Sequence, residues 1–115
     1  MVQEFHRAAG TPDRDCPSYP GKDRVNLRKH LIQEEALEVI EALSKGTFEE
    51  LAKELADLLV VTYGAAAEFG IPMDKIFEEV HRSNMSKIGG PVRADGKLLK
   101  PANYASPNLA PLLGK

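Results

Sequence analysis

Two acidic pairs mark the stretch that decides the fold, residues 33–57, which reads QEEALEVIEALSKGTFEELAKELAD. Glu35 and Glu38 form the first pair, and Glu54 and Asp57 form the second. Residues three apart share one face of a helix, so each pair projects from one side. Four carboxylates brought to one point repel each other unless a cation lies between them. The stretch therefore predicts a site for a hard cation such as Mg²⁺, which takes oxygen ligands and commonly bridges to phosphate.

A tight turn joins the two acidic helices. Thr47 to Glu50 has the pattern of a capping box, with Thr47 as the N-cap and Glu50 reaching back. Gly46 stands where a left-handed residue is expected to end the preceding helix. So short a link forces an antiparallel hairpin. Glu38 and Glu54 each lie eight residues from Gly46, so the hairpin brings them level, about 12 Å from the turn at the helical rise.

Hydrophobic periodicity predicts an all-α fold of antiparallel helical hairpins with a four-helix-bundle-like core. The expected helices cover residues 2–9, residues 23 or 24 to 44, residues 48–69, and residues 72 to 86 or 87. A loop rich in Pro and Gly fills residues 10–22. Residues 91–115 form an irregular tail, in which the pair Asp95-Gly96 predicts a small hairpin turn.

The helix over residues 48–69 is apolar nearly all round beyond Asp57, and a helix of this kind is buried on every face. One neighbouring hairpin cannot cover it in so short a chain. The small residues at 64–67 would let another helix approach closely. We therefore expect a second copy of the chain to complete the core, as a homodimer built on this helix.

Bulk composition is that of a globular protein of 115 residues with 43% apolar and 28% charged residues. Its length suggests a single domain over residues 1–115, with residues 91–115 as an extended basic tail. Cys16 is the only cysteine, which fits a reducing compartment. No apolar run approaches the length of a membrane span, and no signal peptide is read at the start. The expectation is a cytoplasmic protein without a membrane partner.

Charge is distributed unevenly along the chain. Residues 1–80 carry a net charge of −7, and residues 81–115 carry +5. A basic third beside acidic helices suits a small metal-bound polyanion, whereas a nucleic-acid partner would call for a long basic stripe. The chain also lacks the glycine-rich fingerprints of dinucleotide and P-loop sites.

Basic and amide side chains follow the third long helix. Arg82, Asn84 and Lys87 either hold the phosphates and base of a nucleotide or complement the helix dipole. The dipole accounts for Arg82 and Lys87 better than for Asn84. Lys97 and Lys100, on the tail, either form a lid that neutralises a polyphosphate or belong to a solvated hairpin, and spacing alone favours the hairpin.

These motifs resemble a known family. EEALE at residues 34–38 and ELAD at residues 54–57 look like the ExxE…ExxD signature of the all-α NTP pyrophosphohydrolases, the MazG-like superfamily. NMSK at residues 84–87 and DGKLLKP at residues 95–101 also resemble members of the group. The dUTP-cleaving MazG-like branch is the most similar, and the resemblance covers residues 2–104.

The resemblance implies a site and an assembly. Mg²⁺, for which Mn²⁺ could substitute, would be held by four residues: Glu35, Glu38, Glu54 and Asp57. Glu34 matches the water-activating base of the dUTP-cleaving branch, and Asn84 and Lys87 match nucleotide contacts. The implied fold is completed by dimerisation, and in some members by a tetramer.

The implied activity is hydrolysis of a nucleoside triphosphate between its α- and β-phosphates, which releases a nucleoside monophosphate and pyrophosphate. The expected role is house-cleaning of the nucleotide pool, on dUTP or related pyrimidine nucleotides. Two alternatives stay open. Phosphoribosyl-ATP pyrophosphohydrolases share the fold and the signature, and a non-catalytic helical module could bind a nucleotide through the same hairpin.

Overall fold

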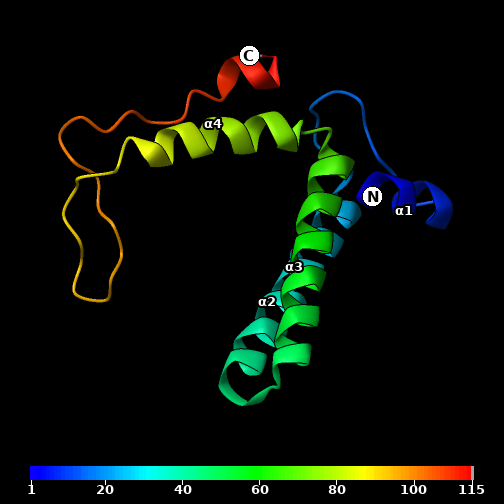
Figure 1. The fold of residues 1–115 in the computed structure, drawn as a ribbon. Coiled ribbons are helices and arrows are strands. Elements are labelled where there is room, and N and C mark those ends of the chain that lie inside the picture. The colour runs from blue at the N-terminus through cyan, green and yellow to red at the C-terminus, as the bar shows by residue number, and fades with distance from the viewer. Residues whose placement is uncertain (115) are drawn as a thin grey trace. The chain divides into compact units, whose positions relative to one another are not determined.

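The computed structural model describes residues 1–114, which form four α-helices and a closing turn of 3₁₀ helix (Figure 1). The helices are Val2–Ala9 (α1), Lys22–Lys45 (α2), Phe48–Phe69 (α3) and Met73–Met85 (α4), and the 3₁₀ turn is Ala110–Leu113 (η1). The described residues contain no strand beyond one isolated bridge. The predicted all-α class is therefore confirmed.

The chain divides into two compact units, one from Met1 to Ile71 and one beginning at Pro72. The first unit holds α1, α2 and α3, and the second holds α4 and the tail. No single helix within residues 1–114 is both long and apolar enough to cross a membrane.

In the first unit, α2 and α3 form the predicted antiparallel hairpin (Figure 1). The capping box is present: the Thr47 hydroxyl accepts from the backbone N–H of Glu50 at 3.2 Å, and the Thr47 N–H donates to the Glu50 carboxylate. The left-handed cap predicted at Gly46 is wrong, because this residue is extended, with φ −82° and ψ 166°. Glycine is needed there for a different reason. A Cβ at this position would lie 2.8 Å from the carbonyl oxygen of Ala42.

The loop between α1 and α2 covers the C-terminal end of α3. Backbone N–H groups of Arg14 and Ser18 donate to the carbonyl oxygens of Ala67 and Phe69, at 2.8 and 2.9 Å. These bonds satisfy carbonyls that a helix end leaves without partners. Gly70 follows with φ +71°, in the left-handed conformation that ends many helices. The predicted loop therefore has a structural role as a strap over the helix end.

Three of the four small residues of α3 are covered within the chain, so the prediction that they receive a helix of a second copy is wrong for Gly64, Ala66 and Ala67. Gly64, Ala66 and Ala67 are buried, and α1 packs on α3. A Cβ on Gly64 would lie 2.7 Å from Nη1 of Arg28 and 3.0 Å from Nε2 of His6. The missing side chain thus makes room for two polar residues of the same chain.

A buried ion pair network lies beside this close approach. The Glu68 carboxylate is fully buried and accepts hydrogen bonds from the guanidinium groups of Arg24 and Arg28, the latter at 2.6 Å. Burial alone would raise the pKa of Glu68, but the hydrogen bonds and positive charges of the two arginines outweigh it and hold this pKa below its usual value. Arg28 is itself buried, so the network ties α2 to α3 far from the turn.

The second unit contains the predicted hairpin turn after α4. Val92 and Leu98 form an antiparallel bridge, and the Arg93 N–H donates to the Lys97 carbonyl at 2.7 Å. Gly96 has φ +94°, as a tight turn requires. The end of the tail, beyond the hairpin, was expected to stay extended, and this is wrong for Ala110–Leu113, where a proline fits the first turn of η1.

The buried ion pairs predict how acid affects the fold. A carboxylate whose pKa is depressed on folding adds stability above its unfolded pKa, and this stability is lost as the pH falls through the folded pKa. We expect Glu68→Gln to cost about 3 kcal/mol in free energy of unfolding at pH 7, since it leaves buried guanidinium charge uncompensated. Below about pH 4.3 the difference in free energy of unfolding between the variant and the wild type should become smaller. Urea unfolding across pH measures both effects.

The matched control for this prediction is Glu41→Gln, because Glu41 forms only an exposed pair with Lys45 on α2. Its unfolding free energy should stay close to that of the wild type at every pH. An equal, small loss for both variants at pH 7 would show that the buried network does not hold α2 against α3.

Candidate metal and nucleotide site

Three of the four predicted ligands converge in the first unit. Glu35 and Glu38 from α2 and Glu54 from α3 each offer one carboxylate oxygen, and the three oxygens lie within 4.8 Å of one another. The antiparallel register of the hairpin brings them level, as the sequence predicts. Asp57 does not belong to this group; its carboxylate instead lies 2.7 Å from Nζ of Lys53.

The negative charge of the three carboxylates is only partly compensated by neighbouring groups. One carboxylate oxygen of Glu35 and one of Glu54 are buried without a hydrogen-bond partner. The Glu38 carboxyl lies close enough to Glu54 to raise the pKa of Glu54, burial adds to the rise, and Lys53 only partly offsets it. Buried acceptors without donors are costly, and a cation would satisfy them. A set of carboxylate oxygens alone suits hard divalent ions such as Mg²⁺ or Mn²⁺.

Lys53 supplies positive charge at the edge of this group, and it is not among the residues predicted from the sequence. Its ammonium lies 2.7 Å from an oxygen of Asp57 and 3.4 Å from one of Glu54, and these carboxylates raise its pKa. The four-residue spacing between Lys53 and Asp57 was the available signal. While it is paired with Lys53, the Asp57 carboxylate lies outside the group formed by the other three.

Glu34, the predicted base, is exposed on α2. Adjacent helical residues point in different directions, so Glu34 borders the carboxylate group without belonging to it. A shallow pocket of about 240 Å³ extends from Glu38 and Glu54 toward the turn. Its remaining lining residues are Glu41, Ala42, Lys45, Gly46 and Glu50. Such an acidic pocket would repel a polyphosphate that arrives without a cation.

The predicted substrate contacts lie in the second unit, and only two of them lie against the same aromatic ring. Lys87 and Lys100 both approach the ring of Tyr104, with Nζ atoms 5.8 and 5.0 Å from its centroid. Asn84 and Lys97 are exposed. Two of the four predicted residues thus lie against Tyr104, which is not among the residues predicted from the sequence.

Arg82, considered above as a phosphate donor, has partners within the second unit. Its guanidinium pairs with Glu79 on the preceding turn of α4 and donates to the carbonyl oxygen of Ser106 at 2.9 Å. It therefore serves to attach the tail to α4. The helix-dipole alternative is likewise not needed to explain its position.

Comparison with known proteins assigns the chain to a family. The model of the phosphoribosyl-ATP pyrophosphohydrolase family matches residues 2–84, which include all four acidic positions. The chain belongs to this family, and the expected membership of the all-α NTP pyrophosphohydrolase superfamily is confirmed.

The similar proteins include the phosphoribosyl-ATP pyrophosphatases of Bacillus cereus and Bacillus anthracis, each 41% identical over 71 residues, or 60% of this chain and 64% of the relative. An uncharacterized protein of Acanthamoeba polyphaga mimivirus is 34% identical over 77 residues, or 64% of this chain and 31% of the viral protein. The chain thus spans less than two thirds of these relatives. Their names fit the phosphoribosyl-ATP alternative better than dUTP cleavage.

Lys53 offers a test of the cation site. Lys53→Met should lower the melting temperature in EDTA, because Glu54 and Asp57 lose their counter-charge. It should also enlarge the rise in melting temperature produced by Mg²⁺, since Asp57 no longer has to leave an ion pair. Thermal scans with and without Mg²⁺ measure both effects.

Lys45→Met is the control, because Lys45 forms a similar exposed pair on the same hairpin, with Glu41 at 3.7 Å. It should leave the Mg²⁺-dependent rise unchanged. If Lys53→Met and Lys45→Met respond to Mg²⁺ alike, Lys53 does not compete with a cation for these carboxylates.

Proposed function

We propose that this chain is a metal-dependent nucleotide pyrophosphohydrolase, which cleaves between the α- and β-phosphates and releases a monophosphate and pyrophosphate. The observation that carries the proposal is the convergence of Glu35, Glu38 and Glu54 with two buried, unpartnered oxygens among them. Family membership supports the same chemistry. Phosphoribosyl-ATP is the first substrate to consider because of the names of the relatives, and dUTP and related pyrimidine nucleotides are the competing candidates.

Mg²⁺, or Mn²⁺ in its place, would be held by Glu35, Glu38 and Glu54, with Asp57 as the fourth ligand once it leaves Lys53. When bound, the ion would neutralise phosphate charge and act as a Lewis acid. The acidic surface around these residues needs such an ion before it can accept a polyphosphate. With the cation bound, a hairpin rich in negatively charged carboxylates could bind a substrate that is also negatively charged.

Glu34 is our candidate for the general base. Glu34 is exposed and directly precedes the ligand Glu35 on α2. In this role its carboxylate would take the proton of an attacking water and pass it to solvent. The water oxygen then bonds to phosphorus, and the bridging P–O bond breaks. Lys87, Lys97, Lys100 and Asn84 are the proposed substrate contacts, the lysines on the leaving pyrophosphate, whose charge grows as that bond breaks.

We also propose that the functional form is at least a homodimer. Several large apolar side chains remain exposed on the hairpin: Leu37, Ile40 and Leu43 on α2, and Leu55, Leu59 and Val60 on α3. Exposed apolar surface of this kind invites association, and a symmetric pair of copies would cover it. The predicted interface thus moves from the small residues of α3 to these larger side chains.

The activity is tested by product analysis with phosphoribosyl-ATP, ATP, dUTP and dCTP in the presence of Mg²⁺. We expect monophosphate and pyrophosphate from at least one of them. Glu34→Gln should keep Mg²⁺ binding and lower kcat by about 100-fold or more, as loss of a general base does. Glu54→Gln should lose both Mg²⁺ binding and turnover. The control Glu41→Gln, outside the three-carboxylate group, should retain both.

Two outcomes would contradict the proposal. Release of orthophosphate would mean that another phosphate bond is cleaved. Nucleotide binding without turnover, unchanged by Glu34→Gln, would instead identify a non-catalytic nucleotide-binding module.

The dimer is tested with a matched pair of substitutions. Leu59 on α3 and Phe5 on α1 are equally exposed, at 59%. Leu59→Glu should produce monomers in light scattering, because it places charge in the proposed interface, and Phe5→Glu should not. A monodisperse wild-type monomer with full activity would overturn the proposed dimer.

A further inference from the structure

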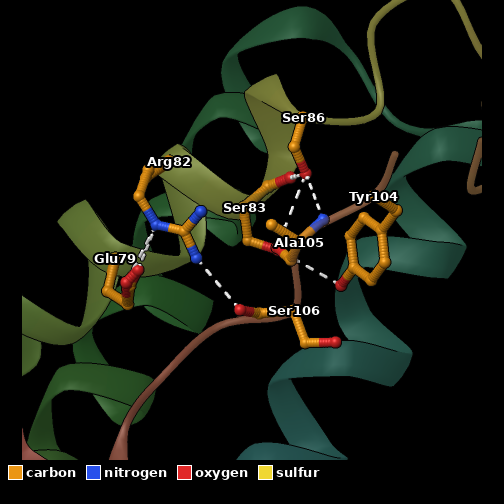
Figure 2. A network of polar contacts seen from close by, with 7 residues as sticks. All are labelled: Glu79, Arg82, Ser83, Ser86, Tyr104, Ala105 and Ser106. Carbon is orange, nitrogen blue, oxygen red and sulfur yellow. Dashed lines mark hydrogen bonds and ion pairs between the residues drawn. The ribbon is translucent and has the colours of Figure 1, made fainter. Parts of the chain in front are cut away.

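Tyr104 lies where the tail crosses the last turns of α4, and its hydroxyl is held by a buried partner. The Ser83 hydroxyl donates to the Tyr104 hydroxyl oxygen at 3.1 Å (Figure 2). Ser83 is 1% exposed, so this bond is anchored inside the second unit. A buried hydroxyl usually takes a partner, and here that partner fixes one end of an aromatic side chain.

Neighbouring bonds hold the same stretch of tail. The backbone N–H of Ala105 donates to the Ser86 hydroxyl at 3.0 Å, and Arg82 donates to the carbonyl oxygen of Ser106 at 2.9 Å (Figure 2). Three consecutive tail residues are thus tied to one end of α4. The position of the tyrosine ring is therefore set by the backbone as well as by its own hydroxyl.

The Tyr104 ring gathers two lysines that are far apart in sequence. Lys87, just beyond α4, and Lys100, after the hairpin turn, place their ammonium groups 5.8 and 5.0 Å from the ring centroid. An ammonium group is attracted to the face of an aromatic ring at such distances. Within residues 72–114, neither lysine forms an ion pair with a carboxylate. Two like charges held near one ring without a counter-charge form a site that favours an anion.

The pKa of the Tyr104 hydroxyl depends on this positive charge. The hydrogen bond from Ser83 lowers the pKa of Tyr104, burial works in the opposite direction, and the charges of Lys100 and Lys87 lower it further. The tyrosine is thus a natural probe of the two ammonium groups. An anion that neutralises them should raise its pKa.

We propose that Tyr104 is a positioning residue that holds the Lys87 and Lys100 ammonium groups together as one site for the pyrophosphate part of the substrate and product. This inference rests on the proposed function. Lysine stems are long and flexible, so ordering two of them on one ring in advance lowers the entropic cost of binding a polyphosphate. Tyr104 need not touch the phosphates itself. Lys97, on the turn of the hairpin, does not share the ring.

The test is calorimetric binding of inorganic pyrophosphate to the full chain at low salt without divalent ions. Tyr104→Leu should weaken binding about tenfold, the size expected for losing one solvent-exposed cation–π contact to each of the two lysines. Tyr104→Phe keeps the ring and should stay within about twofold of wild type. Tyr19→Leu is the control, since Tyr19 packs on Phe69 in the first unit. Undiminished binding by Tyr104→Leu would overturn the proposal.

A spectroscopic readout separates positioning from a purely structural role and serves if Tyr104→Leu does not fold. Tyrosinate absorbance should show the Tyr104 pKa rising in Lys100→Gln, in Lys87→Gln and on addition of pyrophosphate to the wild type. Each lysine variant should also bind pyrophosphate more weakly. A Tyr104 pKa that does not respond to the lysines or to pyrophosphate would contradict the proposal.

These measurements distinguish this inference from the proposed function. If pyrophosphate binding depends on Tyr104 but no nucleotide is hydrolysed, the proposed activity fails and the anion site stands. If a nucleotide is cleaved to pyrophosphate but its binding is indifferent to Tyr104, this inference alone fails.

Discussion

Repulsion between carboxylates is the constraint around which the α2–α3 hairpin is built. The hairpin register holds oxygens of Glu35, Glu38 and Glu54 within 4.8 Å of one another, and two buried oxygens there lack donors. Such a cluster of carboxylates destabilises the fold unless a cation binds to it. The neighbouring Glu38 carboxyl also raises the pKa of Glu54, as expected for acidic groups held this close together. The capping box and the tight turn matter because they fix the register that creates this repulsion.

The other end of the hairpin shows how the same chain treats an acid that has only a structural role. Glu68 is buried as deeply as any residue in the unit, yet two arginines satisfy it and lower its pKa. At the acidic end, Lys53 reaches only the edge of the group, through Asp57 and Glu54. One end of the hairpin is neutralised within the chain, and at the other end we propose that a bound cation supplies the missing positive charge.

Sequence alone predicted the parts of this arrangement that depend on local rules. The capping box at Thr47 set the start of α3, and equal spacing of Glu38 and Glu54 about the turn predicted their convergence. Contacts between distant segments could not be predicted. Periodicity does not show that Arg28 and His6 would occupy the space over Gly64, so that part of α3 was assigned to a second copy.

Other differences have equally specific causes. Gly46 was expected to be left-handed, but the chain needs a close approach to α2 there and no positive φ. Asp57 was grouped with the other acids because spacing cannot weigh its pull toward Lys53. Tyr104 escaped notice because it has no motif of its own, and its role follows from the segments that meet around it.

The most direct test of the cation site is a crystal structure of the protein with Mn²⁺, located by its anomalous scattering. Our prediction is a peak bonded to oxygens of Glu35, Glu38 and Glu54, with the Asp57 carboxylate moved from Lys53 to the ion. A structure at the same Mn²⁺ concentration with no peak there, and with Asp57 still paired to Lys53, would contradict it.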